Sequence, residues 1–295
     1  MGSKHFRGKD MGLAFLALFA VGVIAMTFTE DDVVAEDTTT DADTETEETT
    51  EETVTTEDGT ITGTSLADTL LVDSAEITDV LAGDGDDIIT TQAGEEDTPL
   101  SPEIYGGEGD DQIDARQAAT ADVYGGAGDD ILQGETYSTF DGSSDFYGGE
   151  GDDQLGLHTS AEFDAFDAPS VTPALYGDGG DDTFNINLTE GALDFDSFDE
   201  SGEIPDSGSD LVARIQDFNA EEDTLNVDIT SFVEDTEENP TYTGFTLTEV
   251  PATDDVPAYV EMRLNFELES GQDFTSIINL SGGPFPTAED INIIQ

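Results

Sequence analysis

Residues 105–113 read Tyr-Gly-Gly-Glu-Gly-Asp-Asp-Gln-Ile, and the eight-residue motif that starts at Gly106, Gly-Gly-x-Gly-Asp-Asp-x-apolar, occurs five times. The copies, some with one substitution or shifted glycine, span residues 82–89, 106–113, 125–132, 148–155 and 177–184. They hold 14 of the 31 glycines, so the glycines are placed by position and not by composition. Repeats of this kind are the sequence signature of a stacked architecture. We number the motif positions 1 to 8.

The glycines and aspartates of the motif suit a loop that wraps a hard cation. Glycine reaches positive φ without steric cost, so a loop with three glycines in four positions can turn sharply and point carbonyl oxygens inward. The aspartate at position 6 supplies a carboxylate where the loop ends. Calcium takes about six to eight oxygen ligands of these kinds in a flexible shell.

Apolar residues flank each loop and predict a strand on either side of it. Position 8 is always apolar, and a tyrosine directly precedes four of the five loops. The loop length never changes, whereas the segments between the motifs vary in length. We therefore expect coils of parallel strands with the loops along one edge. The tyrosines are expected to form a packed stack: Tyr105, Tyr124, Tyr147 and Tyr176.

The motif resembles the glycine-rich nonapeptide of the RTX (hemolysin-type) calcium-binding family, and the resemblance covers roughly residues 63–184. It implies an all-β fold, a right-handed parallel β-roll or β-helix, in which successive loops hold calcium between them. The segments between the motifs lack the glycine pattern of the motif, so we expect calcium along one edge only. The implied ligands are the carboxylates of Asp87, Asp111, Asp130, Asp153 and Asp182. The implied backbone ligands come from Gly83, Gly85, Gly106, Gly107, Gly109, Gly125, Gly126, Gly128, Gly148, Gly149, Gly151, Gly177, Gly179 and Gly180.

An earlier segment, residues 63–70, is interpreted as a degenerate first coil. It keeps the first glycine, an aspartate (Asp68) and the final apolar residue but lacks the other glycines. Five good loops predict four calcium ions between them. Pairing of Asp68 with the next loop predicts a fifth ion.

Stacking of the loops predicts that folding depends on calcium. Neighbouring strands lie about 4.7 to 4.9 Å apart, so the position-6 carboxylates would form a column of like charges at about that spacing. Two unit charges about 4 Å apart repel by about 4 kcal/mol at an effective dielectric constant of about 20. We expect the coils to loosen without a cation and to stiffen when calcium binds.

Simpler interpretations apply to part of this pattern. A single Gly-Asp loop is usually a solvated turn, and the position-5 aspartates are expected to face solvent. From residue 29 onward the chain has 70 acidic residues and three basic ones, which also suits a protein of a salty habitat with vestigial loops. Metal binding separates that interpretation from the first. The charge excludes nucleic acid as a partner, because phosphate contacts need cationic side chains.

The first 60 residues differ in kind from the rest. Residues 1–10 form a basic flank, residues 11–28 an uncharged hydrophobic run, and residues 29–60 are mostly Thr, Asp and Glu. The run from Met11 to Phe28 predicts a hydrophobic helix, either an uncleaved membrane anchor or a signal segment cleaved after Ala25. The basic flank orients the amino terminus to the cytoplasm, so the remainder is expected outside a bacterial cell or on its surface. Residues 29–60 predict a disordered acidic linker.

The remaining residues divide into a predicted calcium-binding roll, residues 61–190, and a β-rich capping region, residues 191–295. In the latter, Val260, Met262 and Leu264 alternate with polar residues, which is the pattern of a half-buried strand. A stack of coils needs such a cap at its end.

These features predict a noncatalytic, extracytoplasmic calcium-binding module, displayed on a surface or secreted, with a structural or adhesive role. Calcium is the expected partner, and an adhesive role would add a cell-surface or self-association partner. The alternative is a secreted hydrolase with a carboxylate pair in a pocket of the C-terminal β region. A zinc-protease His-Glu-x-x-His helix is excluded, because the chain has only His5 and His158.

Overall fold

The computed structural model describes residues 54–92, 100–136, 144–159, 172–189, 210–231, 240–253, 256–267 and 273–295. They belong to one compact unit, residues 50–295. The predicted hydrophobic helix at residues 11–28 and the acidic linker up to residue 53 lie outside the described residues. Within the described ranges, no helix is both long and apolar enough to cross a membrane.

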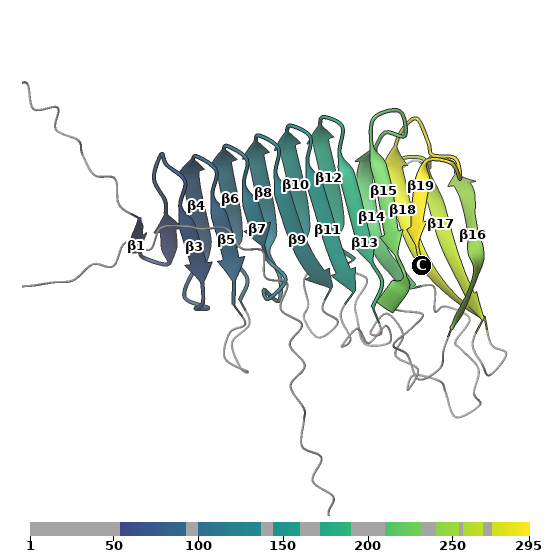
Figure 1. The fold of residues 1–295 in the computed structure, drawn as a ribbon, viewed down its shortest axis with the longest axis horizontal. Coiled ribbons are helices and arrows are strands. Elements are labelled where there is room, and N and C mark those ends of the chain that lie inside the picture. The colour runs from purple at the N-terminus through teal and green to yellow at the C-terminus, as the bar shows by residue number, and fades with distance from the viewer. Residues whose placement is uncertain are drawn as a thin grey trace, which may run out of the picture. The chain divides into compact units, whose positions relative to one another are not determined.

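The described chain is all-β and forms two long sheets (Figure 1). Sheet A has eleven strands, in the spatial order β1 (Thr55–Glu57), β2 (Thr60–Thr62), β4 (Asp79–Asp84), β6 (Glu103–Glu108), β8 (Asp122–Ala127), β10 (Asp145–Glu150), β12 (Ala174–Gly179), β14 (Asp210–Phe218), β18 (Asp273–Gly282), β17 (Tyr259–Glu267) and β16 (Thr241–Val250). Sheet B has eight, in the order β3 (Thr69–Val72), β5 (Ile88–Thr91), β7 (Gln112–Asp114), β9 (Ile131–Thr136), β11 (Gln154–Thr159), β13 (Thr183–Asn187), β15 (Thr224–Asp228) and β19 (Ile291–Ile294).

Successive coils of the chain stack in parallel register. Each coil contributes one strand to sheet A, then a glycine loop, then one strand to sheet B. Equivalent motif positions pair between neighbouring coils, for example Gly107 with Gly126 and Gly126 with Gly149. The expected coils of parallel strands are confirmed, and the arrangement is consistent with a β-roll or β-helix. The glycine loops line one edge of the stack, the upper edge in Figure 1.

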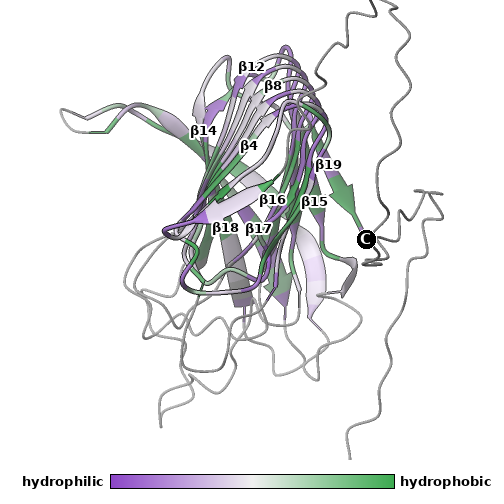
Figure 2. Ribbon diagram, turned by 90° about the vertical axis from the view of Figure 1, so that its left-hand side faces the viewer, coloured by the Kyte–Doolittle hydropathy of each residue, from purple (hydrophilic) through white to green (hydrophobic). Residues whose placement is uncertain are grey.

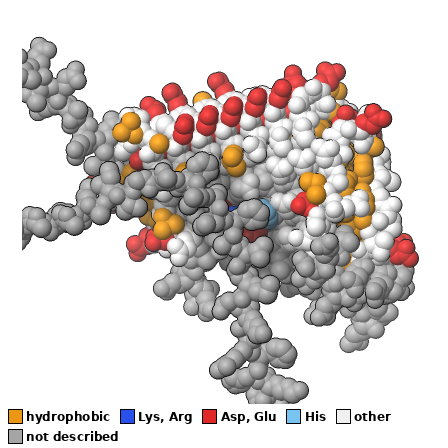
Figure 3. All heavy atoms as spheres, in the orientation of Figure 1, with side chains coloured by type: hydrophobic (Ala, Val, Ile, Leu, Met, Phe, Trp, Pro, Cys, Tyr) orange, Lys and Arg blue, Asp and Glu red, His pale blue; other side chains and the backbone are white. Residues whose placement is uncertain are grey.

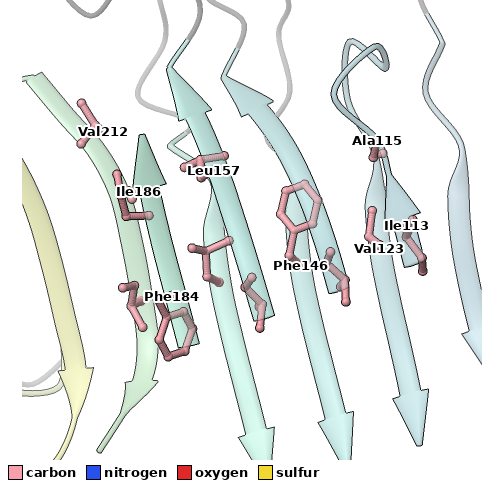
Figure 4. Packing of buried hydrophobic residues seen from close by; sticks show 14 of the residues in the cluster. Ile113, Ala115, Val123, Phe146, Leu157, Phe184, Ile186 and Val212 are labelled. Carbon is pink, nitrogen blue, oxygen red and sulfur yellow. The ribbon is translucent and has the colours of Figure 1, made fainter. Parts of the chain in front are cut away.

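The core lies between the two sheets because alternate residues of each strand point inward. The position-8 residues are all buried, with at most 1% of their surface exposed, as their apolar character predicted: Ile89, Ile113, Leu132, Leu155 and Phe184. Seen along the stack, the strands superimpose into two layers (Figure 2). Phe146 of β10, Leu157 of β11 and Ile186 of β13 illustrate the packing of inward side chains (Figure 4).

The four motif tyrosines form a continuous stack on the outer face of sheet A, as expected. Ring centroids are 4.7 Å apart between Tyr105 and Tyr124, 4.8 Å between Tyr124 and Tyr147, and 4.6 Å between Tyr147 and Tyr176. The rings are parallel within 10°. The spacing equals that of the strands, so the stack is a direct consequence of the parallel register.

The parallel stack does not end at the last glycine loop. Strand β14 pairs in parallel with β12, and β15 pairs in parallel with β13. Strands β18 and β19 add a further coil, again in parallel. Only then does sheet A continue with β17 and β16 in antiparallel pairing. Tyr242, Phe245 and Leu247 of β16 are partly buried against the same core as the coils, so the hairpin closes this end of the stack.

Candidate metal centre in the glycine loops

The position-6 aspartates are brought together in a single column at the loop edge, which we call the inner ladder. Its loop members are buried, with at most 3% of their surface exposed: Asp87, Asp111, Asp130, Asp153 and Asp182. Each backbone N–H donates to the Oδ1 atom of the aspartate in the next coil. The N···O distances are 2.8 Å from Asp87 to Asp111, 2.7 Å from Asp111 to Asp130, 2.7 Å from Asp130 to Asp153 and 2.9 Å from Asp153 to Asp182.

The second carboxylate oxygen of most ladder members has no partner. The Oδ2 atoms of Asp87, Asp111, Asp130 and Asp153 are buried and accept no hydrogen bond. A buried carboxylate oxygen without a hydrogen bond or a counter-charge is costly. Four such atoms in successive coils are a repeated feature that needs a ligand or a proton.

The space beside three of the four unpaired oxygens, those of Asp111, Asp130 and Asp153, is open because position 1 of their loops is glycine, whereas the Asp87 loop has Ala82 at position 1. A Cβ added to Gly106 would overlap Oδ2 of Asp111 and lie 2.6 Å from the carbonyl oxygen of Gly125 in the next coil. A Cβ on Gly125 would likewise overlap Oδ2 of Asp130 and lie 2.7 Å from the carbonyl oxygen of Gly148. The glycines therefore leave room between a carboxylate of one coil and a carbonyl of the next.

The glycines at positions 2 and 4 are required for a different reason. Gly107 and Gly109 have φ of 128° and 129°, which side chains rarely adopt. A Cβ on Gly107 would also overlap the carbonyl oxygen of Gly83 in the preceding coil. Positive φ and close stacking of one loop on another thus both demand glycine.

The last loop keeps this geometry with altered residues. Asp178 occupies position 2 with φ of 65°, and the glycine at position 4 is Gly180, with φ of 149°. A Cβ on Gly177 would overlap Oδ2 of Asp182, as in the other loops. No carbonyl of a following coil is among the nearest atoms there, because no glycine loop follows.

Burial raises the pKa of the inner-ladder carboxyl groups. The pKa rises to about 6 for Asp111 and Asp182 and to about 7 for Asp130 and Asp153. Desolvation is the largest cause; the ladder N–H bonds act in the opposite direction, and the charges of neighbouring aspartates add to the rise. The pKa of Asp87 is raised for the same reasons. Near neutral pH these groups either hold a proton or need a cation.

The position-5 aspartates form an outer ladder on the same edge. They are exposed, as expected, and each N–H donates to Oδ1 of the position-5 aspartate in the preceding coil: Asp110 to Asp86 at 3.0 Å, Asp129 to Asp110 at 2.9 Å, Asp152 to Asp129 at 2.8 Å and Asp181 to Asp152 at 2.9 Å. Acidic side chains line this edge in the space-filling view (Figure 3). The inner and outer ladders run in opposite directions along the stack.

The donor set of the inner ladder fits a hard divalent cation. The gaps at Asp111, Asp130 and Asp153 each offer an unpaired carboxylate oxygen and a nearby main-chain carbonyl, which are the ligand types of calcium, and Asp87 offers the unpaired oxygen. Across the described ranges, no three Asp, Glu, His or Cys side chains gather at one point. A cation at this edge must therefore complete its shell with main-chain carbonyls or water.

Comparison with known proteins finds no relative. No model of a known protein family, no curated protein and no solved structure matches the chain.

Three residues at the carboxyl-terminal end of the inner ladder were not predicted as site residues from the sequence. The N–H of Asp182 donates to Oδ1 of Asp223 at 3.1 Å, so Asp223 continues the inner ladder. Asp217 accepts hydrogen bonds from the N–H groups of Gly177 at 3.0 Å and Asp178 at 2.8 Å. It lies beside the last glycine loop, where no further glycine loop follows. Asn219 donates its N–H to Oδ2 of Asp223 at 2.7 Å. Residues 217–223 contain no glycine, so the loop motif does not extend to them.

Asp68 lies at the other end of the inner ladder. Its N–H donates to Oδ1 of Asp87 at 2.6 Å, so the degenerate first coil is in register with the others. Its Oδ2 atom, however, accepts the N–H of Thr64 at 2.6 Å and is not left unpaired. Asp68 is also partly exposed.

Proposed function

We propose that the chain is a noncatalytic, extracytoplasmic calcium-binding module of the RTX kind. In this proposal the inner ladder binds Ca²⁺ between successive loops, and binding makes the stack of coils rigid. The stack then serves as a structural or adhesive element, anchored through residues 11–28 or secreted after their removal.

The observation that carries the proposal is the column of four buried, unpaired Oδ2 atoms. Protonation is one way to satisfy the column without a cation, but the pKa values of about 6 to 7 make it incomplete at neutral pH. A divalent cation removes both the desolvation cost and the repulsion between neighbouring carboxylates. Its binding energy exists only when the loops are stacked, so it adds to the free energy of unfolding.

The identity of the cation follows from the ligand chemistry. The ligands are oxygens only, from one carboxylate and main-chain carbonyls, and the described residues contribute no imidazole at this edge. Oxygen ligands select hard cations, and an irregular loop shell suits calcium better than the octahedral demands of magnesium. Extracellular calcium modules typically have dissociation constants of about 10⁻⁴ to 10⁻³ M, so the module would fill outside the cell.

A calcium titration of residues 50–295 tests the proposal. We expect saturable binding and a rise in unfolding temperature at about millimolar calcium, measured by calorimetry and far-ultraviolet circular dichroism. The test variant is Asp111→Asn with Asp130→Asn, which lowers the charge of the inner ladder. The matched control, Asp110→Asn with Asp129→Asn, makes the same charge change in the exposed outer ladder and should keep the response. A protein whose unfolding temperature is the same in calcium and in chelator would contradict the proposal.

A further inference from the structure

Six of the seven members of the inner ladder fall into two classes, distinguished by the second carboxylate oxygen, and Asp182 belongs to neither. In the interior of the ladder, Oδ2 of Asp87, Asp111, Asp130 and Asp153 has no partner. At its two ends the equivalent atom does have one. Oδ2 of Asp68 accepts the N–H of Thr64, and Oδ2 of Asp223 accepts the N–H of Asn219, at 2.6 and 2.7 Å.

The same internal contact closes both ends, although the sequences differ. In each case the donor is the residue four places before the aspartate. That residue is motif position 2, which in the interior loops is a glycine with φ between 118° and 128°: Gly83, Gly107, Gly126 and Gly149. Thr64 and Asn219 are not among the residues with positive φ. The residue at position 2 therefore decides whether the loop turns its own N–H onto the carboxylate.

We propose that the ladder binds four cations, at Asp87, Asp111, Asp130 and Asp153, and that Thr64 and Asn219 end the series at its two ends. This inference rests on the proposed function. An N–H and a cation are both positive partners, so they compete for the same oxygen. Where Oδ2 already accepts an N–H, a cation gains little, and the partial exposure of Asp68 lowers the desolvation cost of its charge as well.

Asp182 is excluded from the series for a related reason. The segment that follows it in the stack, residues 217–223, has no glycine, and the three atoms nearest to a Cβ added at Gly177 all belong to Asp182. Asp217 stands there instead, and it already accepts the two N–H groups of Gly177 and Asp178. The ends of the ladder are thus closed by hydrogen bonds that need no metal.

The first test counts calcium ions by equilibrium dialysis of residues 50–295, a compact unit whose core residues all lie within it. Excess potassium chloride suppresses diffuse binding to the acidic surface. We expect four ions, one for each unpaired oxygen. Asp111→Asn should lower the count and weaken binding, whereas Asp68→Asn should leave the count at four. Circular dichroism checks that both variants are folded.

The second test rebuilds the missing site. Replacing Thr64 and Leu66 together by glycine restores glycine at positions 2 and 4 of the first coil. Leu66 is 66% exposed, so the change removes little core contact. We expect this variant to bind one more ion than the parent. The matched control, Thr64→Ala with Leu66→Ala, removes the same side chains without the freedom to adopt positive φ, and should stay at four.

The outcomes separate this inference from the proposed function. No saturable calcium at all would overturn both. Five or six ions on the parent, or a lower count in Asp68→Asn, would overturn the four-site inference and leave calcium binding intact. A double-glycine variant that is folded but still binds four ions would show that position 2 does not set the ends of the series.

Discussion

At the scale of single residues, replacing a loop glycine destabilises the fold in two ways that can be separated. The new side chain strains a positive φ, and its Cβ overlaps the neighbouring loop. We expect Gly126→Ala to lower the free energy of unfolding by more than the roughly 1 to 3 kcal/mol of a strained φ. The excess arises because a Cβ there overlaps the carbonyl oxygen of Gly107. Gly244→Ala is the matched control, since Gly244 has a similar φ of 126° but no atom within 4 Å of an added Cβ. Urea denaturation in calcium measures both, and equal losses would contradict the role of close stacking.

The sequence predicts the position of each ladder aspartate but not the state of its oxygens. The aspartate at position 6 can be predicted because it follows glycines at fixed spacing. The structure places all five of these aspartates in one buried column. The Oδ1 atoms accept N–H groups from residues 19 to 29 positions away in the preceding coil, and Oδ2 is paired only where the position-2 N–H of the same loop reaches it, as at Asp68 and Asp223. Asp217 and Asp223 were missed for the same reason, because only the register with β12 and β13 gives them their partners.

At the scale of elements, the tyrosine stack couples neighbouring strands of sheet A. Stacked aromatic pairs contribute about 0.5 to 1.5 kcal/mol beyond the area that they bury. A double-mutant cycle of Tyr124→Leu and Tyr147→Leu should therefore give a coupling energy in that range. Tyr105→Leu and Tyr176→Leu form the control cycle, because two other rings separate that pair, and their effects should add. Denaturation in calcium gives the four free energies of each cycle, and equal coupling in both would argue against ring stacking.

The inner ladder is expected to determine how the free energy of unfolding depends on pH when a chelator has removed calcium. Its folded pKa values of about 6 to 7 exceed the unfolded value of about 3.9, so the folded state binds more protons between these limits. The free energy of unfolding without calcium should consequently fall as pH rises from about 5 to about 8. Calcium binds the deprotonated carboxylates, so the stabilisation that it adds should be larger at pH 8 than at pH 5.

The control for this pH profile separates the ladder from the general acidity of the chain. Asp130→Asn with Asp153→Asn should flatten the profile in chelator, because two of the raised pKa values are removed. Asp129→Asn with Asp152→Asn removes two exposed carboxylates from the outer ladder and should leave most of the slope. A chelated parent protein that becomes more stable between pH 5 and 8 would refute the raised pKa values.

At the scale of the whole molecule, the sequence predicts the repeating part of the fold better than its continuation. The motif specifies loop, strand and register in each coil that has a glycine loop, so the parallel stack could be predicted for residues 63–184. Strands β14 and β15 follow no glycine loop, and β18 and β19 reach their places only after the β16–β17 hairpin. Those partners are set by long-range pairing, which a local pattern does not encode. The sequence therefore predicts a separate cap after residue 190. In the structure, strands β14, β15, β18 and β19 of this region continue the parallel stack.

This continuity predicts that the glycine-loop coils cannot fold without the region that follows them. A chain of residues 50–189 lacks β14 and β15, so the fully buried Leu175, Phe184 and Ile186 would lose the strands beside them. It also lacks Phe218, whose ring centroid lies 6.0 Å from that of Phe184, and Asp217 and Asp223, which close the ladder. An open end of a stack exposes apolar surface and unpaired strand edges. We expect no cooperative calorimetric transition from residues 50–189 even in saturating calcium, whereas residues 50–295 should show one. A sharp calcium-dependent transition in the shorter chain would mean that the loops and their cations suffice, and that β14 and β15 only extend a stack that is already stable.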